Sequence, residues 1–262
     1  MSEVTLTRQG DIAWMRLNQP PRNTMTPELM SAFARRIEEL KSWSNIRVLV
    51  VASVGRHFCA GAELTKDTHG ADAGLGGPPG DAERLRGLYV PFLSLTELNI
   101  PSVAVVQGAA VGGGLGLACA CDFRIVAPCT RFAAPFVRLG IHPGMALTYY
   151  LPALVGLPRA LDMLLIGREV LGEEALDWGL ANRCVARDRL ESAGQMFAEA
   201  LAAGSPAVVQ WSRRAIYRAV QHNPHGAADI ESLAQALTFL SKDAVEGVQA
   251  FREKRPPEFQ GD

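Results

Sequence analysis

The sequence has no block of basic residues and no excess of either charge. Its 262 residues carry 26 Lys and Arg against 27 Asp and Glu, which gives a net charge of -1 at pH 7. Proteins that bind nucleic acids or anionic membranes usually concentrate basic residues in one patch. We therefore expect no nucleic-acid partner and no membrane partner, and a few local cations must bind any anionic ligand.

Carboxylates are scarce in the middle of the chain. From Asn99 to Leu161 the one acidic residue is Asp122, which we interpret as a structural carboxylate. Enzymes that transfer protons usually hold an acid or a base beside the reacting carbons. This part of the sequence therefore offers few candidates for a catalytic acid or base.

The sequence also lacks a convincing membrane span and a metal-binding cysteine pattern. The uncharged run from Ile100 to Cys121 contains Pro101, Gln107 and several glycines, which favours a strand, a loop and a buried helix. The first residues have no basic and apolar regions typical of a secretion signal. The 5 cysteines form no second metal-spaced pair, so we expect buried free thiols, no metal site and a cytoplasmic location.

Apolar strands alternate with helices in the first part of the chain. Thr26 and Pro27 predict the start of a helix, because a hydroxyl N-cap followed by proline is a common helix start. Strands are expected at residues 12–17, 46–52, 103–106 and 123–126, and a buried helix at 113–120. This order predicts an α/β fold with parallel strands and crossover helices.

Strand signals fade after about residue 188. Helices are expected at residues 190–203, 207–221, 227–240 and 242–254. Their apolar residues, such as Leu233 and Leu237, either contact a partner subunit or pack on the body of the same chain. We therefore divide the chain into an α/β core at 1–188 and a C-terminal helical region at 189–262.

A glycine-rich and proline-rich segment spans residues 68–82. Such a segment either covers a ligand pocket or forms a surface insertion. The sequence leaves both interpretations open.

Two runs of small residues, at 55–64 and 107–116, each follow a predicted strand. Small side chains allow a ligand to approach the backbone closely. Two such loops that face each other can direct two peptide N–H groups at one oxygen and form an oxyanion hole. The alternative is that the glycines serve tight helix–strand packing.

These motifs resemble the enoyl-CoA hydratase/isomerase (crotonase) family. The similarity runs in the family's order through residues 17–25, 58–64, 101–122, 132–144 and 246–255. It implies a crotonase-like spiral of ββα units with a C-terminal helical oligomerisation region. It also implies an acyl-CoA enzyme, assembled as a homotrimer or a dimer of trimers, with no cofactor beyond the coenzyme A of its substrate.

The resemblance implies a role for particular residues. The backbone N–H groups of Ala62 and Gly113 would form the oxyanion hole, with Gly113 at the start of a helix. The residues that would contact coenzyme A are Arg22, Asn23, Thr24, Ala60, Leu64, Lys66, Phe251 and Lys254. The alternative for the cations among them is that they are solvated surface residues.

The sequence departs from the family's hydratases at both positions of their catalytic glutamates, which are Gly116 and Phe136 here. Neither residue can transfer a proton, so we expect isomerase or decarboxylase/lyase chemistry through a stabilised enolate rather than standard hydration. His142 is a candidate acid or base, or a structural histidine that bonds loop backbone. Packing is favoured for Tyr149 and Tyr150.

Two other functions stay open. One is an enoyl-CoA hydratase that acts on an unusual acyl group, with His142 as the acid or base. The other is a non-catalytic acyl-CoA-binding protein that kept the pocket and lost the chemistry.

Overall fold

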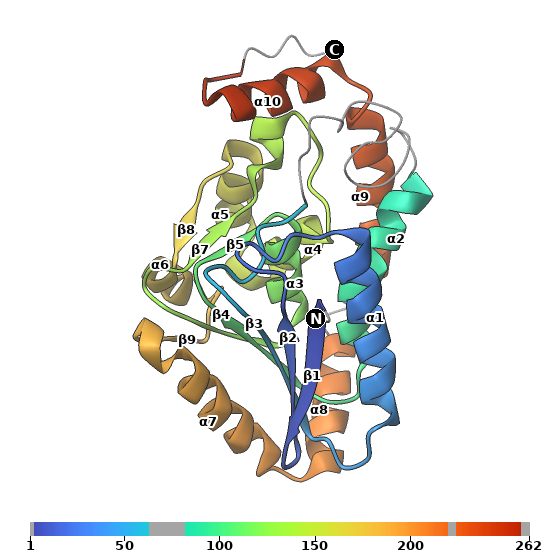
Figure 1. Ribbon diagram of the computed structural model, residues 1–262, viewed down its shortest axis with the longest axis vertical. Helices are drawn as coiled ribbons and strands as arrows, with labels where there is room; N and C mark the ends of the chain where they lie inside the picture. The colour runs from blue at the N-terminus through green and yellow to red at the C-terminus, as the bar shows by residue number, and fades with distance from the viewer. Residues whose placement is uncertain (1–2, 63–81, 220–223, 258–262) are drawn as a thin grey trace.

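A six-stranded sheet forms the centre of the molecule (Figure 1). The computed structural model describes residues 3–62, 82–219 and 224–257. The sheet has the order β1 (Val4–Gln9), β2 (Ile12–Leu17), β3 (Val48–Ser53), β4 (Ser102–Val106), β6 (Phe123–Val126) and β9 (Arg183–Cys184). β1 pairs antiparallel with β2, and every later pair is parallel. The predicted α/β fold is confirmed.

A smaller sheet has the strand order β5 (Ala109–Val111), β7 (Arg131–Ala133) and β8 (Val170–Leu171). β5 follows β4 directly and leads into α3 (Gly113–Ala120), so these elements form one ββα unit. The hairpin β1–β2 and the following helix α1 (Pro27–Ser42) form another. The strand at β5 lies inside the run of small residues that the sequence predicts as a loop.

Helix α1 begins as its sequence predicts. The Thr26 hydroxyl accepts a hydrogen bond from the Leu29 N–H at 3.2 Å, and Pro27 occupies the first turn. The helix then buries Phe33 and Ile37 against the sheet. The remaining helices of this half are α2 (Ala82–Leu93), α4 (Leu147–Val155), α5 (Leu157–Leu161) and α6 (Gly172–Asp177), with short turns η1 (Ser94–Glu97), η2 (Pro135–Leu139), η3 (Asp162–Ile166) and η4 (Arg187–Arg189).

Alternating strand residues supply two hydrophobic cores, one on each face of the sheet. Ala13 and Met15 of β2 face the core that contains α1, whereas Ile12 and Trp14 face the other core. Helix α7 (Leu190–Ala202) covers this second face (Figure 1). Both faces of the central strands are therefore buried, as their continuous apolar sequences predict.

The C-terminal helices reach both ends of the molecule. After α7 come α8 (Pro206–Ala219), α9 (Pro224–Thr238) and α10 (Lys242–Glu253), close to the predicted ranges. Helix α9 lies beside α2, and α10 packs on η2 (Figure 1). The division at 188/189 into two regions stays a prediction.

The structure also departs from the sequence-based expectations. No sequence pattern predicted β1 or α2. The expectation that all cysteines are buried is wrong, because Cys129 is exposed and Cys184 is half-buried, while Cys59, Cys119 and Cys121 are buried. The segment 68–82 lies outside the described residues except for its last residue.

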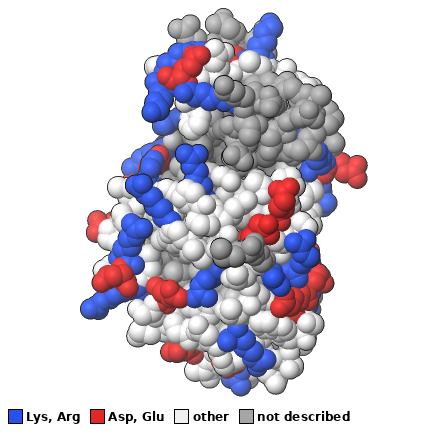
Figure 2. Space-filling view, viewed as in Figure 1, with Lys and Arg blue, Asp and Glu red and all other residues white. Residues whose placement is uncertain are grey.

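Charges of both signs are interspersed over the face of the molecule in Figure 2. None of the helices in the described ranges is long and apolar enough to cross a membrane. Within the same ranges, no three side chains from His, Cys, Asp and Glu converge as metal ligands would.

Asp122 is a structural carboxylate, as predicted, and it joins β4 to α8. It accepts hydrogen bonds from the Ser102 backbone N–H at 2.7 Å and from the Arg213 Nε at 2.9 Å. The Tyr217 hydroxyl donates to it at 2.5 Å. Only 8% of the Asp122 side chain and 10% of the Arg213 side chain are exposed, so a buried ion pair links α8 to the sheet.

The variant Asp122→Ala should lose about 3 kcal/mol of unfolding free energy, because it leaves the Arg213 charge buried without its partner. Denaturant unfolding measures this loss. Glu38→Ala is the matched control, since it breaks the exposed pair with Lys41 and should cost less than about 1 kcal/mol. Equal losses of unfolding free energy in the two variants would contradict a stabilising role for the buried Asp122–Arg213 pair.

Thiol labelling should follow the observed burial. Burial raises the pKa of the Cys59, Cys119 and Cys121 thiols to about 12, so these thiols stay protonated and inaccessible in the folded protein. Iodoacetamide should modify Cys129 first and Cys184 more slowly, as peptide mass spectrometry would reveal. Early modification of Cys119 would contradict the packing of α3.

Candidate active site

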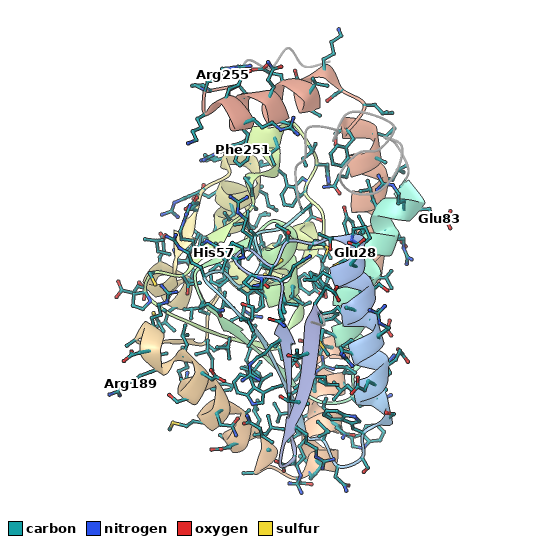
Figure 3. All side chains as sticks on the ribbon, in the orientation of Figure 1. Glu28, His57, Glu83, Arg189, Phe251 and Arg255 are labelled. Atoms are coloured by element: carbon teal, nitrogen blue, oxygen red, sulfur yellow. The ribbon has the colours of Figure 1, made fainter. Side chains whose placement is uncertain are left out.

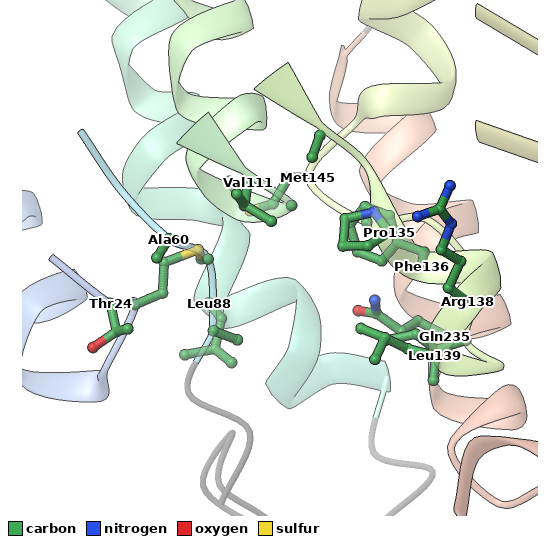
Figure 4. A pocket seen from close by; sticks show the side chains of 18 of the residues that line it. Thr24, Ala60, Leu88, Val111, Pro135, Phe136, Arg138, Leu139, Met145 and Gln235 are labelled. Carbon is green, nitrogen blue, oxygen red and sulfur yellow. The ribbon is translucent and has the colours of Figure 1, made fainter. Parts of the chain in front are cut away.

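A cavity of about 550 Å³ lies between the two small-residue loops, α2, α9 and the segment that follows β7 (Figure 4). Most of its walls are apolar. The lining residues are Arg22, Thr24, Met25, Ala60, Gly61, Ala62, Leu85, Leu88, Tyr89, Val111, Gly112, Gly113, Arg131, Ala133, Pro135, Phe136, Arg138, Leu139, Ile141, Gly144, Met145, Glu169, Gln235, Phe239 and Phe251.

Backbone hydrogen bonds hold the two loops together. The Cys59 N–H donates to the Ala109 carbonyl at 3.1 Å, and the Val111 N–H donates to the Cys59 carbonyl at 3.0 Å. The Met25 N–H donates to the Gly61 carbonyl at 2.9 Å and ties the chain after β2 to the same place. Three segments that are distant in sequence therefore meet at one point.

Glycine permits this close approach. Gly61 has φ +79°, and a Cβ at this position would lie 2.7 Å from the Val111 carbonyl oxygen and 3.7 Å from the Gly113 nitrogen. A Cβ on Gly114 would lie 2.0 Å from the Cys59 carbonyl oxygen. Larger residues at these positions would separate the two loops.

The N–H groups of Ala62 and Gly113 both belong to residues that line the cavity, and neither has an acceptor among the described residues. Gly113 is the first residue of α3, whose first helical bond runs from the Gly116 N–H to the Gly112 carbonyl at 3.0 Å. The helix N-terminus adds positive potential to this end of the cavity. Together these groups can stabilise an oxygen that gains negative charge.

The two positions that the resemblance assigns to the hydratase glutamates, Gly116 and Phe136, are both surrounded by apolar atoms. Gly116 is buried in α3, and a Cβ at this position would lie 2.4 Å from the Met145 Cβ. Phe136 is buried in η2, and its ring lines the cavity. Apolar atoms therefore occupy both places.

His142 does not line the cavity, although Ile141 and Gly144 do. Its backbone N–H donates to the Thr238 hydroxyl at 3.0 Å, and its Nδ1 lies 2.8 Å from the Pro143 carbonyl oxygen. This geometry matches the alternative interpretation, a histidine that bonds loop backbone.

Some of the predicted coenzyme A contacts line the cavity, and others do not. Arg22 and Thr24, which follow β2, line it, and so does Ala60 in the loop after β3. The Asn23 side chain instead faces the protein, because its Nδ2 donates to the Val54 and His57 carbonyls at 2.9 Å. Asn23 is fully buried and has φ +49°, so it shapes the turn that presents its two neighbours. The predicted contacts Leu64 and Lys66 lie outside the described residues.

Helix α10 brings one of its two predicted residues to the cavity. Phe251 lines the cavity from the side of α10 that faces the body of the molecule, while 64% of the residue stays exposed (Figure 3). Lys254 ends α10 with φ +56° and is exposed, outside the cavity lining.

Several polar residues that the sequence did not predict also line the cavity. Tyr89 comes from α2 and Gln235 from α9, and both are buried. Arg131 forms two hydrogen bonds with Glu169, at 2.8 and 2.5 Å, and this partner lowers the pKa of the Glu169 carboxyl. Arg138 lines the cavity beside them. No local motif marks any of these residues.

Comparisons with known proteins agree over nearly the whole chain. The sequence model of the family described as enoyl-CoA hydratase/isomerase matches residues 7–262. A probable enoyl-CoA hydratase of Bacillus subtilis (strain 168) is 32% identical, and a carnitinyl-CoA dehydratase of Salmonella paratyphi A is 34% identical, each over 100% of both chains. The crystal structure of an enoyl-CoA hydratase/isomerase from Pseudoalteromonas atlantica T6c superposes with a TM-score of 0.85 at 28% identity, covering 98% of this chain and 99% of that one.

The variant Gly61→Ala should test the close approach of the two loops. Its Cβ would contact the Val111 carbonyl oxygen at 2.7 Å, so the loops must separate at a cost of about 1–3 kcal/mol beyond the backbone strain. Gly10→Ala is the matched control, because Gly10 has φ +65° but no atom within 4 Å of the added Cβ. Denaturant unfolding compares them, and equal losses would contradict the contact.

Proposed function

Since the chain belongs to the enoyl-CoA hydratase/isomerase family and is an acyl-CoA enzyme, we propose that it stabilises a thioester enolate without the hydratase glutamates. The Ala62 and Gly113 N–H groups bind the thioester oxygen. The reaction is a lyase reaction at the α carbon, of which decarboxylation is the simplest example.

One observation carries this proposal: two N–H groups without described acceptors belong to adjacent loops that line the same apolar cavity. In a cavity with little water, such groups stabilise developing charge more strongly than solvent does. They are also fixed before the substrate arrives, because backbone hydrogen bonds and glycine contacts hold both loops.

The lack of carboxylates at Gly116 and Phe136 favours bond cleavage over hydration. Hydration needs groups that activate water and deliver a proton, which contribute about 10²–10⁴ in rate. In a decarboxylation, the bond between the α carbon and the carboxylate breaks, and its electron pair moves into the enolate. Carbon dioxide leaves, and a proton from water then restores the thioester.

Double-bond isomerisation is the second candidate, because Tyr89 and Glu169 place ionisable groups on the cavity wall. Isomerisation needs a base that moves a proton between two carbons of the acyl chain. The hydrogen bonds from Arg131 lower the pKa of Glu169 and make it a weaker base. This pairing makes isomerisation the less favoured reaction.

In this proposal the coenzyme A portion of the substrate lies along Arg22, Thr24 and Ala60, with Phe251 beside the acyl or pantetheine part; all four residues line the cavity. Lys254 is expected to reach a phosphate within an oligomer. Exposed apolar residues of α9, Leu233 and Leu237, support a homotrimer or a dimer of trimers. A cytoplasmic location also stays a prediction.

Two variants at one position should isolate the Gly113 N–H. Gly113→Ala and Gly113→Pro both add a Cβ that displaces the end of the flexible Met25 side chain, but only proline removes the N–H. Proline is well tolerated at the first residue of a helix. We expect kcat for decarboxylation of a carboxyacyl-CoA to fall about 10²–10³-fold more in Gly113→Pro than in Gly113→Ala.

Thermal unfolding of both variants checks that the fold is retained. The same wild-type protein is assayed with crotonyl-CoA, where we expect hydration to be negligible. Efficient hydration of crotonyl-CoA would contradict the proposal. So would binding of acyl-CoA thioesters with no turnover of carboxyacyl-CoA or enoyl-CoA substrates, which would favour a non-catalytic binding protein.

A further inference from the structure

One residue of the cavity wall, Met25, contacts both loops that carry the proposed oxyanion donors. Its main chain pairs with the first loop: Met25 forms a parallel bridge with Ala62, and its N–H donates to the Gly61 carbonyl at 2.9 Å. Its side chain reaches the second loop, because a Cβ on Gly113 would overlap the Met25 Sδ and lie 3.0 Å from its Cε. Met25 therefore spans the space between the two loops.

The backbone of Met25 is fixed on both sides along the chain. Two residues earlier, the buried Asn23 side chain donates to the Val54 and His57 carbonyls at 2.9 Å. The residue that follows, Thr26, caps helix α1. The point from which the Met25 side chain extends is therefore held by the sheet and by α1, and it does not depend on the position of α3.

The end of the Met25 side chain fills the space beside the backbone of Gly113. Met25 is only 5% exposed although it lines the cavity. Met145 completes the contact, since its Cγ would lie 3.4 Å from a Cβ on Gly113. A shorter side chain at residue 25 would leave room for water beside the first turn of α3, or would let that turn shift.

Either change weakens the Gly113 N–H as a donor to a substrate. A donor stabilises developing charge best when it is fixed in advance and shielded from water. A displacement of about 1 Å in the groups that surround a reacting centre can cost about 10²-fold in rate. The thioether itself has no proton to transfer, so any contribution of Met25 acts through the position of its neighbours.

We propose that Met25 is a positioning residue, which sets the place of the Gly113 N–H relative to the Ala62 N–H. The inference rests on the proposed function, because it takes these two groups to bind the thioester oxygen. The length of the side chain matters rather than the sulfur. Leucine also places an atom at the δ position and should replace Met25, whereas alanine ends at the β carbon and should not.

Infrared spectroscopy of a bound thioester tests the position of the donors directly. Butyryl-CoA with a ¹³C label at the thioester carbonyl is bound to each protein, since hydrogen bonds to this oxygen lower its stretching frequency. We expect a downshift in the wild-type protein, most of which is lost in Met25→Ala and retained in Met25→Leu. The kcat for decarboxylation of a carboxyacyl-CoA should fall about 10²-fold in Met25→Ala and about threefold or less in Met25→Leu, with KM changed less than about threefold.

Met30→Ala is the matched control. Met30 lies in α1, is 3% exposed and does not line the cavity, so this variant removes the same atoms from the same hydrophobic core. It should lower the thermal unfolding midpoint but keep the full infrared shift and kcat at a temperature where it is folded. If Met25→Ala does not fold, Met25→Val takes its place, because valine also ends before the δ position.

The possible outcomes separate the two proposals. A folded Met25→Ala or Met25→Val protein that keeps the full infrared shift would overturn the role of Met25 and leave the proposed function intact. An equal loss of the shift in Met30→Ala would overturn it too, since the effect would then be general to the core. A wild-type protein that binds butyryl-CoA without any downshift would count against the oxyanion hole and hence against the proposed function itself.

Discussion

The candidate site depends on the close approach of two stretches of backbone. The loop at Cys59–Ala62 exchanges hydrogen bonds with β5 and lies against the first turn of α3, at distances that only glycine allows at residues 61 and 114. Side chains elsewhere shape the cavity, but these contacts fix the positions of its two N–H donors. Any change that separates the loops alters the direction in which those donors point.

The electrostatics of the site follow from the same arrangement. Helix α3 is buried along its whole length and has no charged side chain. The positive potential at its N-terminus therefore comes from peptide groups, which neither titrate nor move far. The charged side chains Arg131 and Glu169 also line the cavity, and they neutralise each other.

Much of the fold could be predicted from local sequence patterns, because the physical causes are local. The N-cap at Thr26 specifies where α1 begins, and the continuous apolar run of β3 indicates a strand buried on both faces. The family resemblance suggested that Ala62 and Gly113 act together; both line the same cavity, and their shared role stays a prediction. Tyr89 and Gln235 could not be predicted, since tertiary packing brings together two helices that are far apart in sequence. His142 illustrates the opposite problem, because its place in the right loop does not determine which way its ring points.

The cavity wall draws on residues from nearly the full length of the chain, from Arg22 to Phe251. No single folding unit contains enough of the wall to hold a ligand, so a binding-competent pocket exists only after α9 and α10 have docked. Occupancy of the pocket and docking of the C-terminal helices are therefore thermodynamically linked. A bound thioester should slow amide hydrogen exchange in α9 and α10, even though the donors that hold its carbonyl oxygen lie in the first half of the chain.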